Sequence, residues 1–196
     1  MKITAKTLPY ILFFLALVPS AQADWEGKIA SKIPPGNSGV PSNLTGVIHM
    51  KKDHLRLDLK SPMDMTFLAD MTGKKAWTLI HAAKLIMATD ISKFQAQAPM
   101  CTTDNIDECL AKKGFKKTGN ETVDGHPCTI YDDKHTKLWR PDDLKEVPSL
   151  KTLVTQSPGK VIETYITEVK VGKQDAKLFE VPTDYHKMDG LQNLFK

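Results

Sequence analysis

Cysteine and histidine are the residue types in this chain that could perform nucleophilic or metal chemistry. The 196-residue sequence holds three cysteines, Cys101, Cys109 and Cys128, and six histidines. Their spacing forms no Cys-x-x-Cys or His-Glu-x-x-His motif, and the chain has no Gly-rich phosphate loop and no Gly-x-Ser-x-Gly nucleophile elbow. We therefore expect a protein that is not an enzyme, with no catalytic residue, no metal site and no cofactor.

The cysteines themselves favour a structural role. In an oxidising compartment three cysteines leave one unpaired, and Cys101 and Cys109 lie eight residues apart in the expected helical insertion. We expect a disulfide between them, which would add about 2–3 kcal/mol of stability, and we expect Cys128 to be a buried free thiol in a strand. The alternatives are a thiol nucleophile at Cys128 and a zinc site of histidines from several strands. His126 would lie roughly 7 Å from Cys128 along a strand, too far for a hydrogen bond.

The N-terminus has the layout of a secretory signal peptide. Lys2 and Lys6 precede an apolar run over residues 11–18, and Ala21-Gln22-Ala23 supplies a cleavage pattern. The alternative is an uncleaved anchor, but the run is shorter than the about 20 apolar residues that span a bilayer. We expect cleavage near Ala23. The product would be periplasmic or secreted, would carry no lipid because Asp24 follows the cut, and would contain no transmembrane segment.

Composition places the remaining chain among ordinary globular domains. Hydrophobic residues make up 41% and charged residues 26% of the sequence. The net charge is +4, and removal of Lys2 and Lys6 with the signal leaves +2. Because nucleic-acid binding needs a clustered basic face, we expect no nucleic-acid partner. Residues 24–196 are expected to form one domain, a monomer large enough to bury a core of its own.

Hydrophobic alternation indicates strands through most of the chain. Leu55, Leu57 and Leu59 alternate with polar residues, and Met63, Met65 and Phe67 continue the pattern beyond Pro62. A period of two places such residues on one face of a sheet. Asp124-Gly125 is a strong hairpin signal. Further strands are expected over residues 25–33, 44–50, 76–80, 84–88, 115–123, 126–132, 136–139, 161–171 and 177–181.

Two helical segments interrupt the strands. Asp90 precedes Ile91 and Phe94 at helical spacing, and Asp104 precedes an apolar stripe that ends at Lys113 and Gly114. Acid at the start, lysine at the end and glycine beyond are helix boundary signals. The pattern predicts an α+β fold in which an antiparallel sheet curves over short helices.

The methionines mark a candidate ligand surface. Five of the eight methionines fall between residues 50 and 87, and thioether side chains adapt to irregular apolar partners. If this face of the sheet is concave it could hold an acyl chain; the alternative is a filled core that uses methionine as packing. The candidate ligand-binding residues are Leu55, Leu57, Leu59, Met63, Met65, Phe67, Trp77 and Met87.

Several motifs resemble the LolA-like superfamily of periplasmic lipoprotein carriers, in particular its branch of uncharacterised domains. They are the stretches at residues 53–58, 73–79, 84–87, 119–128, 136–139 and 179–185. The resemblance implies a curved antiparallel sheet, an incomplete barrel wrapped over a short helical plug, whose concave face binds a lipid, an acyl chain or a lipidated envelope protein. In LolA an arginine near an early strand holds the lid closed, and Arg56 lies in a broadly similar place. The alternative function is an envelope interaction or structural module with a filled core and no small-molecule ligand.

Overall fold

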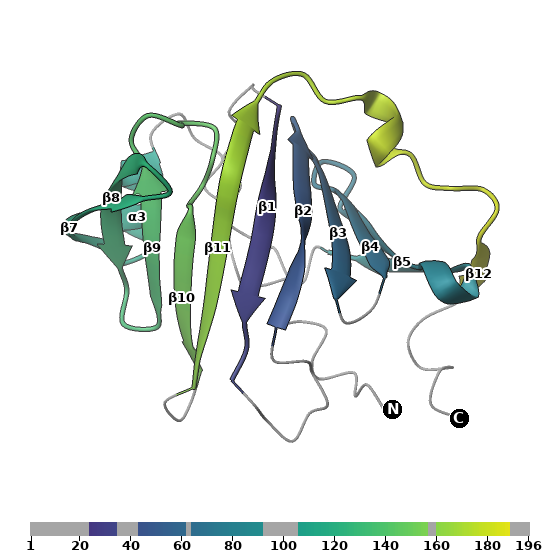
Figure 1. The fold of residues 1–196 in the computed structure, drawn as a ribbon, viewed down its shortest axis with the longest axis horizontal. Helices are drawn as coiled ribbons and strands as arrows, with labels where there is room; N and C mark the ends of the chain where they lie inside the picture. Colours follow the sequence, from purple (N-terminus) through teal and green to yellow (C-terminus); the bar gives the residue numbers. More distant parts are fainter. Residues whose placement is uncertain (1–23, 35–42, 62–63, 92–105, 157–159, 189–196) are drawn as a thin grey trace.

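The computed structural model describes residues 24–34, 43–61, 64–91, 106–156 and 160–188, and its strands form one broad sheet (Figure 1). The predicted signal peptide, Met63, Cys101 and the first predicted helix beyond residue 91 lie outside the described residues. Within the described part of the chain, no helix has the length and hydrophobicity needed to cross a bilayer. The strands are β1 (Trp25–Lys32), β2 (Asn43–Lys51), β3 (His54–Ser61), β4 (Met65–Asp70), β5 (Lys75–Ile80), β6 (Leu85–Asp90), β7 (Lys116–Val123), β8 (His126–Asp132), β9 (Thr136–Pro141), β10 (Lys151–Gln156), β11 (Lys160–Val171) and β12 (His186–Met188).

The sheet is curved and unclosed. Its order is β12-β6-β5-β4-β3-β2-β1-β11-β10-β9-β8-β7, so β12 and β7 are edges that do not pair with each other. Every neighbouring pair is antiparallel except β12 with β6, which run parallel. The first strand therefore lies at the centre of the sheet, and the long β11 returns to pair with it from the opposite half of the chain. The predicted curved, mostly antiparallel sheet is confirmed.

Local sequence signals set several of these elements. Asp124 and Gly125 have φ values of 50° and 83°, the left-handed pair that a two-residue hairpin turn needs, and they join β7 to β8 as predicted. The second predicted helix is α3 (Ile106–Lys112), with Asp107 and Glu108 in its first turn and Lys112 in its last. These charges complement the helix dipole at both ends.

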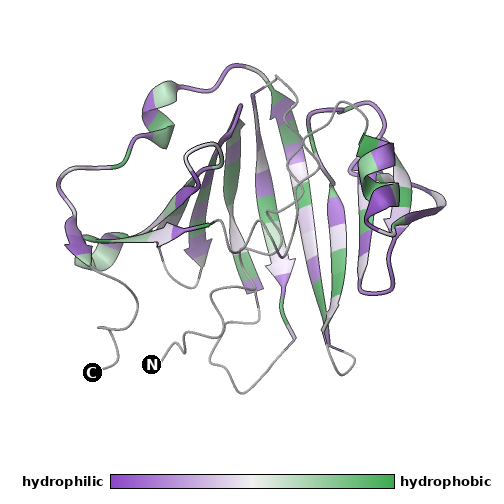
Figure 2. Ribbon diagram, turned by 180° about the vertical axis from the view of Figure 1, so that it is seen from behind, coloured by the Kyte–Doolittle hydropathy of each residue, from purple (hydrophilic) through white to green (hydrophobic). Residues whose placement is uncertain are grey.

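A helical plug is not confirmed. In the described part of the chain α3 is the single α-helix. Its Ile106 and Leu110 pack against Tyr131 of β8 and Leu138 of β9. The helix thus covers one end of the sheet, visible from behind in Figure 2, and not the Leu55–Leu59 strand. The seven residues of α3 are too short to span a twelve-stranded sheet.

Three segments differ from the sequence prediction. β10 was not anticipated, and neither was the three-residue β12. The strand expected over 177–181 is instead a short 3₁₀ helix, η2 (Ala176–Phe179), because the Asp175 carboxylate accepts a hydrogen bond from the Lys177 amide at 3.0 Å and caps the turn. A second 3₁₀ turn, η1 (His81–Ala83), joins β5 to β6.

The two faces of the sheet are defined by register. We call inner the face that carries Leu55, Leu57 and Leu59, which are all buried. One row of that face runs from Ile48 through Leu57 to Phe67. The helix α3 packs on the same face, over β8 and β9. We call outer the face that carries Arg56 and Asp58. Green bands across the strands in Figure 2 mark the apolar positions of the sheet.

Candidate functional site

Most of the predicted ligand-binding residues share the inner face. Leu55, Leu57 and Leu59 belong to the main hydrophobic core, with Met65 and Phe67 packed against it. Leu57 pairs with Phe67, and Leu59 pairs with Met65. Their proximity follows from alternation on two paired strands, so the sequence was sufficient to find it.

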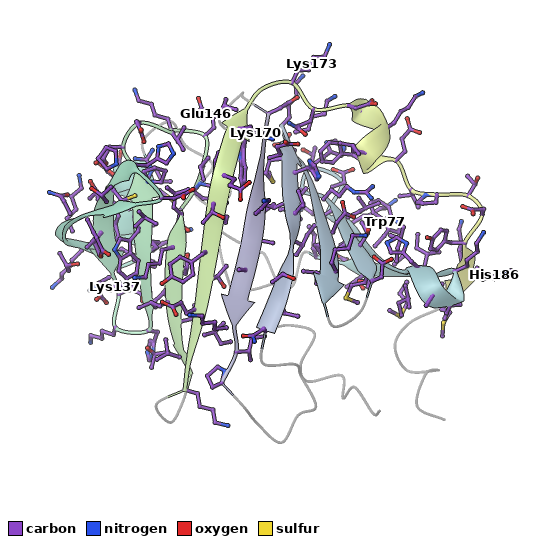
Figure 3. All side chains as sticks on the ribbon, viewed as in Figure 1. Trp77, Lys137, Glu146, Lys170, Lys173 and His186 are labelled. Carbon is purple, nitrogen blue, oxygen red and sulfur yellow. The ribbon has the colours of Figure 1, made fainter. Side chains whose placement is uncertain are left out.

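Trp77 and Met87 lie on opposite faces of the sheet. Met87 pairs with Thr78, which pairs with Phe67, so Met87 lies on the inner face and is buried. Trp77, labelled in Figure 3, pairs instead with Leu68 on the outer face, where it packs in a second apolar cluster with Leu79. Including Trp77 in the inner-face set was wrong, because one residue of register moves a side chain to the opposite side of a sheet.

The inner face carries a pocket at the centre of the sheet, and none of the predicted ligand-binding residues lines it. It opens between β1, β2, β10 and β11, and its empty space is about 430 Å³ including parts open to solvent. The room enclosed within it is about that of a single water molecule. Its lining residues are Trp25, Ile29, Ile48, Met50, Pro148, Ser149, Leu150, Thr152, Thr164 and Ile166.

Sequence reasoning missed this pocket although one signal was present. Trp25 and Ile29 alternate with the polar Glu26 and Lys28 in β1, the same period of two that identified Leu55 to Leu59. What the sequence could not supply is the contact with β11, whose Ile166 pairs with Ile29 from 137 residues further along the chain. Polar atoms in the lining are satisfied locally, since the Ser149 and Thr152 hydroxyls lie 2.8 Å apart.

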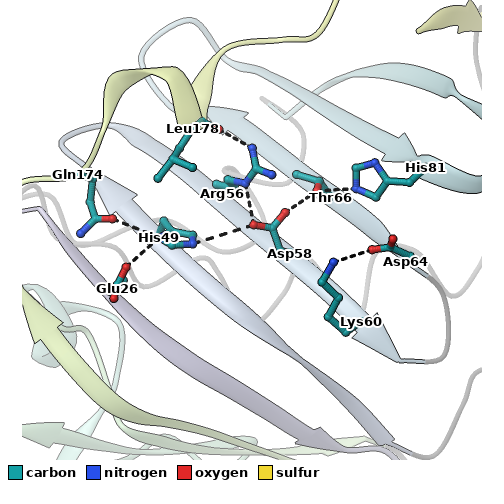
Figure 4. A network of polar contacts seen from close by, with 10 residues as sticks. All are labelled: Glu26, His49, Arg56, Asp58, Lys60, Asp64, Thr66, His81, Gln174 and Leu178. Atoms are coloured by element: carbon teal, nitrogen blue, oxygen red, sulfur yellow. Dashed lines mark hydrogen bonds and ion pairs between the residues drawn. The ribbon is translucent and has the colours of Figure 1, made fainter. Parts of the chain in front are cut away.

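The outer face carries a connected polar network (Figure 4). The Asp58 carboxylate accepts hydrogen bonds from Arg56 Nε at 2.7 Å and from the Thr66 hydroxyl at 2.5 Å. His81 Nε2 lies 2.9 Å from the Thr66 oxygen. Because the Thr66 proton is donated to Asp58, His81 must donate to Thr66 through Nε2–H.

Residues 172–188, which we call the C-terminal strap, lie over this network. Arg56 donates through its guanidinium to the Leu178 carbonyl at 2.7 Å, and His81 Nδ1 lies 2.6 Å from the Tyr185 hydroxyl. Gln174, the one buried residue of the strap, sits 3.1 Å from His49 Nδ1. In Figure 1 the strap leaves the end of β11 and crosses to β12 at the opposite edge. Arg56 therefore fixes this strap on the outer face, and not a lid over the inner one.

The cysteines are placed where the sequence suggested, as far as they are described. Cys128 is free and buried on β8, and its thiol donates to the His126 carbonyl at 3.4 Å. Burial, with the charges of Asp142 and Asp143, raises the pKa of the Cys128 thiol to about 11. A thiol held protonated in this way is a poor nucleophile. Cys109 lies on α3; its pairing with Cys101 stays a prediction.

We expect the native protein to be almost inert to a thiol reagent such as Ellman's reagent at pH 8. A thiol of pKa about 11 is then ionised in roughly one molecule in a thousand. In guanidinium without reductant, one thiol per chain should react if Cys101 and Cys109 are paired, and none in Cys128→Ala. Three reactive thiols would contradict the disulfide.

The histidines do not assemble a metal site. In the ranges that the structure describes, no three histidine, cysteine, aspartate or glutamate side chains come together as metal ligands. His49 and His81 are instead bound into the outer-face network, and His126 Nδ1 lies 2.9 Å from the exposed Asp143. These contacts anchor loops and the strap to the sheet.

Comparison with known proteins assigns the chain to a family. A family model described as a domain of unknown function (DUF4412) matches residues 43–163, and the chain belongs to that family. No curated protein matches it. Among solved structures it is similar to an uncharacterised conserved protein from Thermus thermophilus, with 10% identity, a TM-score of 0.59, and coverage of 95% of this chain and 100% of the other.

Two further structures are similar at lower scores. One is a LolA superfamily protein from Nitrosomonas europaea, with 11% identity, a TM-score of 0.44 and coverage of 92% and 99%. The other is a DUF1329 family protein from Desulfovibrio piger, with 14% identity, a TM-score of 0.42 and coverage of 91% and 97%. The predicted placement in a family of unknown function is confirmed by the family model, and a LolA superfamily protein is among the similar structures, as the resemblance predicted. At these identities the matches bear on the fold alone.

Proposed function

We propose that this protein is an exported, non-enzymatic binding protein that holds a lipid or acyl chain against the inner face of its sheet. The observation that carries the proposal is the central pocket, whose walls come from Trp25, Ile48, Met50 and Ile166 on three neighbouring strands. A concave apolar surface with a few polar groups is what ligand sites share.

The pocket must widen to take an acyl chain, because its enclosed room is that of one water. The wall formed by Pro148, Ser149 and Leu150 is the segment that leads into β10 and contributes no strand of its own. Leu150 is held by backbone hydrogen bonds to Trp139 and Ile166. Movement of Pro148 and Ser149 away from β1 would therefore open the pocket while these bonds and the pairs of β1 with β2 and β11 stay intact.

We further propose that the protein acts as an exported monomer. Cleavage near Ala23 would release residues 24–196 as a single monomeric domain to the periplasm or the medium. Its partner would be a free lipid or the acyl chain of an envelope lipoprotein.

Fluorescence quenching by a brominated fatty acid tests this proposal. Trp25 lines the pocket, whereas Trp77 lies on the outer face, so dibromostearate should quench the wild-type protein and lose most of that effect in Trp25→Phe. Trp77→Phe is the matched control and should be quenched like the wild type. Lipid found by mass spectrometry in an organic extract of the purified protein would support the same conclusion.

The alternative is an envelope interaction module with a filled core. The small room inside the pocket favours it. A protein that yields no lipid on extraction and shows no quenching in any of the three forms would overturn lipid binding and favour this alternative.

A further inference from the structure

Arg140 is a half-buried residue with one buried nitrogen that lacks a hydrogen-bond partner. In the described part of the chain, its Nε is buried and makes no hydrogen bond, and none of the ion pairs involves it. Arginine stays charged at any pH a protein meets. A buried donor without a partner is costly, so native structures usually supply an acceptor.

Register places Arg140 beside the pocket. Leu138 pairs with Thr152, which lines the pocket, and Arg140 follows two residues later on the same face of β9. Trp139 between them faces the other way, stacked under Lys151 at 4.5 Å. Arg140 therefore lies one strand away from the pocket wall, on the inner face.

The charge of Arg140 acts on one acid, Asp107, which is already hydrogen-bonded to other residues. Arg140 lowers the pKa of Asp107 by its charge, but hydrogen bonds from Lys117 and Tyr131 are the larger causes of that shift. Lys117 Nζ lies 2.8 Å from the Asp107 carboxylate, and the Tyr131 hydroxyl donates to its other oxygen. The Asp107 carboxylate therefore already accepts from two donors, and neither of them is Arg140.

A second cation is left unpaired where the helix packs on the same face. Lys113 directly follows α3, and its Nζ is buried without a hydrogen-bond partner. Burial lowers the pKa of Lys113, with no opposing charge to raise it. Leu110 of α3 packs against Leu138 of β9, so both unpaired cations belong to elements that meet at this end of the inner face.

We propose that the ligand is an anionic amphiphile, whose apolar chain lies in the central pocket and whose carboxylate or phosphate group is bound by Arg140. This inference rests on the proposed function and narrows its ligand class. The planar guanidinium can donate two parallel hydrogen bonds to either anion. A neutral lipid of the same chain length offers no such acceptor.

Binding of three 16-carbon probes tests the inference: palmitate, hexadecyl phosphate and hexadecanol. The wild type should bind palmitate or the phosphate more tightly than hexadecanol, and the tighter of the two identifies the head group. Arg140→Gln loses a charge-assisted hydrogen bond, so its affinity for the anionic probe should fall at least about tenfold. Its affinity for hexadecanol should stay unchanged. Lys137→Gln is the matched control, because Lys137 lies on the same strand over the outer-face ring of Trp139.

The stability of the ligand-free variant gives a second readout. Because Arg140→Gln removes a buried donor that lacks a partner, the variant should melt no lower than the wild type. Palmitate should raise the melting temperature of the wild type more than that of the variant. An unchanged palmitate-to-hexadecanol ratio in Arg140→Gln overturns the inference and leaves lipid binding intact. No binding of any probe to the wild type overturns both.

Discussion

Gly46→Ala is expected to lower the free energy of unfolding by about 3 kcal/mol or more, at the upper end of what overpacking costs. A methyl group on Gly46 of β2 would lie 2.1 Å from the Asp58 carbonyl oxygen and 3.2 Å from Leu59 Cα. Both atoms are backbone of β3, so no side chain can rotate to make room. The strand must move, and Leu59, which pairs with Gly46, would leave its buried position.

Gly119→Ala is the matched control for that experiment. Gly119 lies on the exposed edge strand β7, and its added methyl would meet only Ile130 Cδ1 at 3.8 Å, an ordinary contact. A glycine-to-alanine change without a clash is neutral or stabilises by about 0.4–1 kcal/mol. Urea titration of both variants measures the difference, with unchanged m-values confirming a pure stability effect. Equal midpoints for the two variants would contradict the close approach of β2 and β3.

The sequence was most informative where one face of the sheet is apolar and the other polar. Leu55, Leu57 and Leu59 alternate with His54, Arg56 and Asp58, and the structure buries the leucines together. The helix α3 and the Asp124-Gly125 hairpin were also found, because caps and left-handed turns are local signals. Each of these predictions needed only residues within one turn or one strand of each other.

Prediction failed where both faces of the sheet are covered. In β4 to β6 the outer face is also apolar, with Leu68, Leu79 and Ile86 packed under Val181 and Tyr185 of the strap. Strands apolar on both sides lose the alternation that reveals which side is inward. Trp77 was therefore assigned to the wrong face.

The outer-face polar network could not be predicted from the sequence, for a different reason. His49 meets Gln174 across 125 residues, and Arg56 meets Leu178 across 122. Nothing local in β2 or β3 indicates that a segment near the C-terminus will cover them. The sequence shows the charged residues of these strands, and the fold alone shows that they hold the strap.

Asp58→Asn should destabilise the protein by about 2–3 kcal/mol, the cost of removing the charged partner of hydrogen-bonded donors that stay partly buried. The amide cannot accept from Arg56 and Thr66 as the carboxylate does. Both donors lead to the strap, through Leu178 and through His81 to Tyr185. Faster tryptic cleavage after the exposed Lys177 should therefore accompany the loss of stability. Asp64→Asn, which breaks an exposed ion pair with Lys60, is the control and should cost less than about 1 kcal/mol.

The effect of Asp58 should also depend on pH. Burial alone would raise the pKa of Asp58, but hydrogen bonds from Arg56 and Thr66, with the charges of Arg56 and His49, outweigh it and hold the pKa below 3.8. A carboxyl with a lowered folded-state pKa stabilises above its unfolded pKa, and this contribution disappears as pH falls through the folded value. The gap in urea midpoint between wild type and Asp58→Asn should stay constant from pH 7 to 5 and narrow below about pH 4. A gap that persists undiminished at pH 3 would mean that the side chain acts through its shape, and the charged network would not be what holds the strap to the sheet.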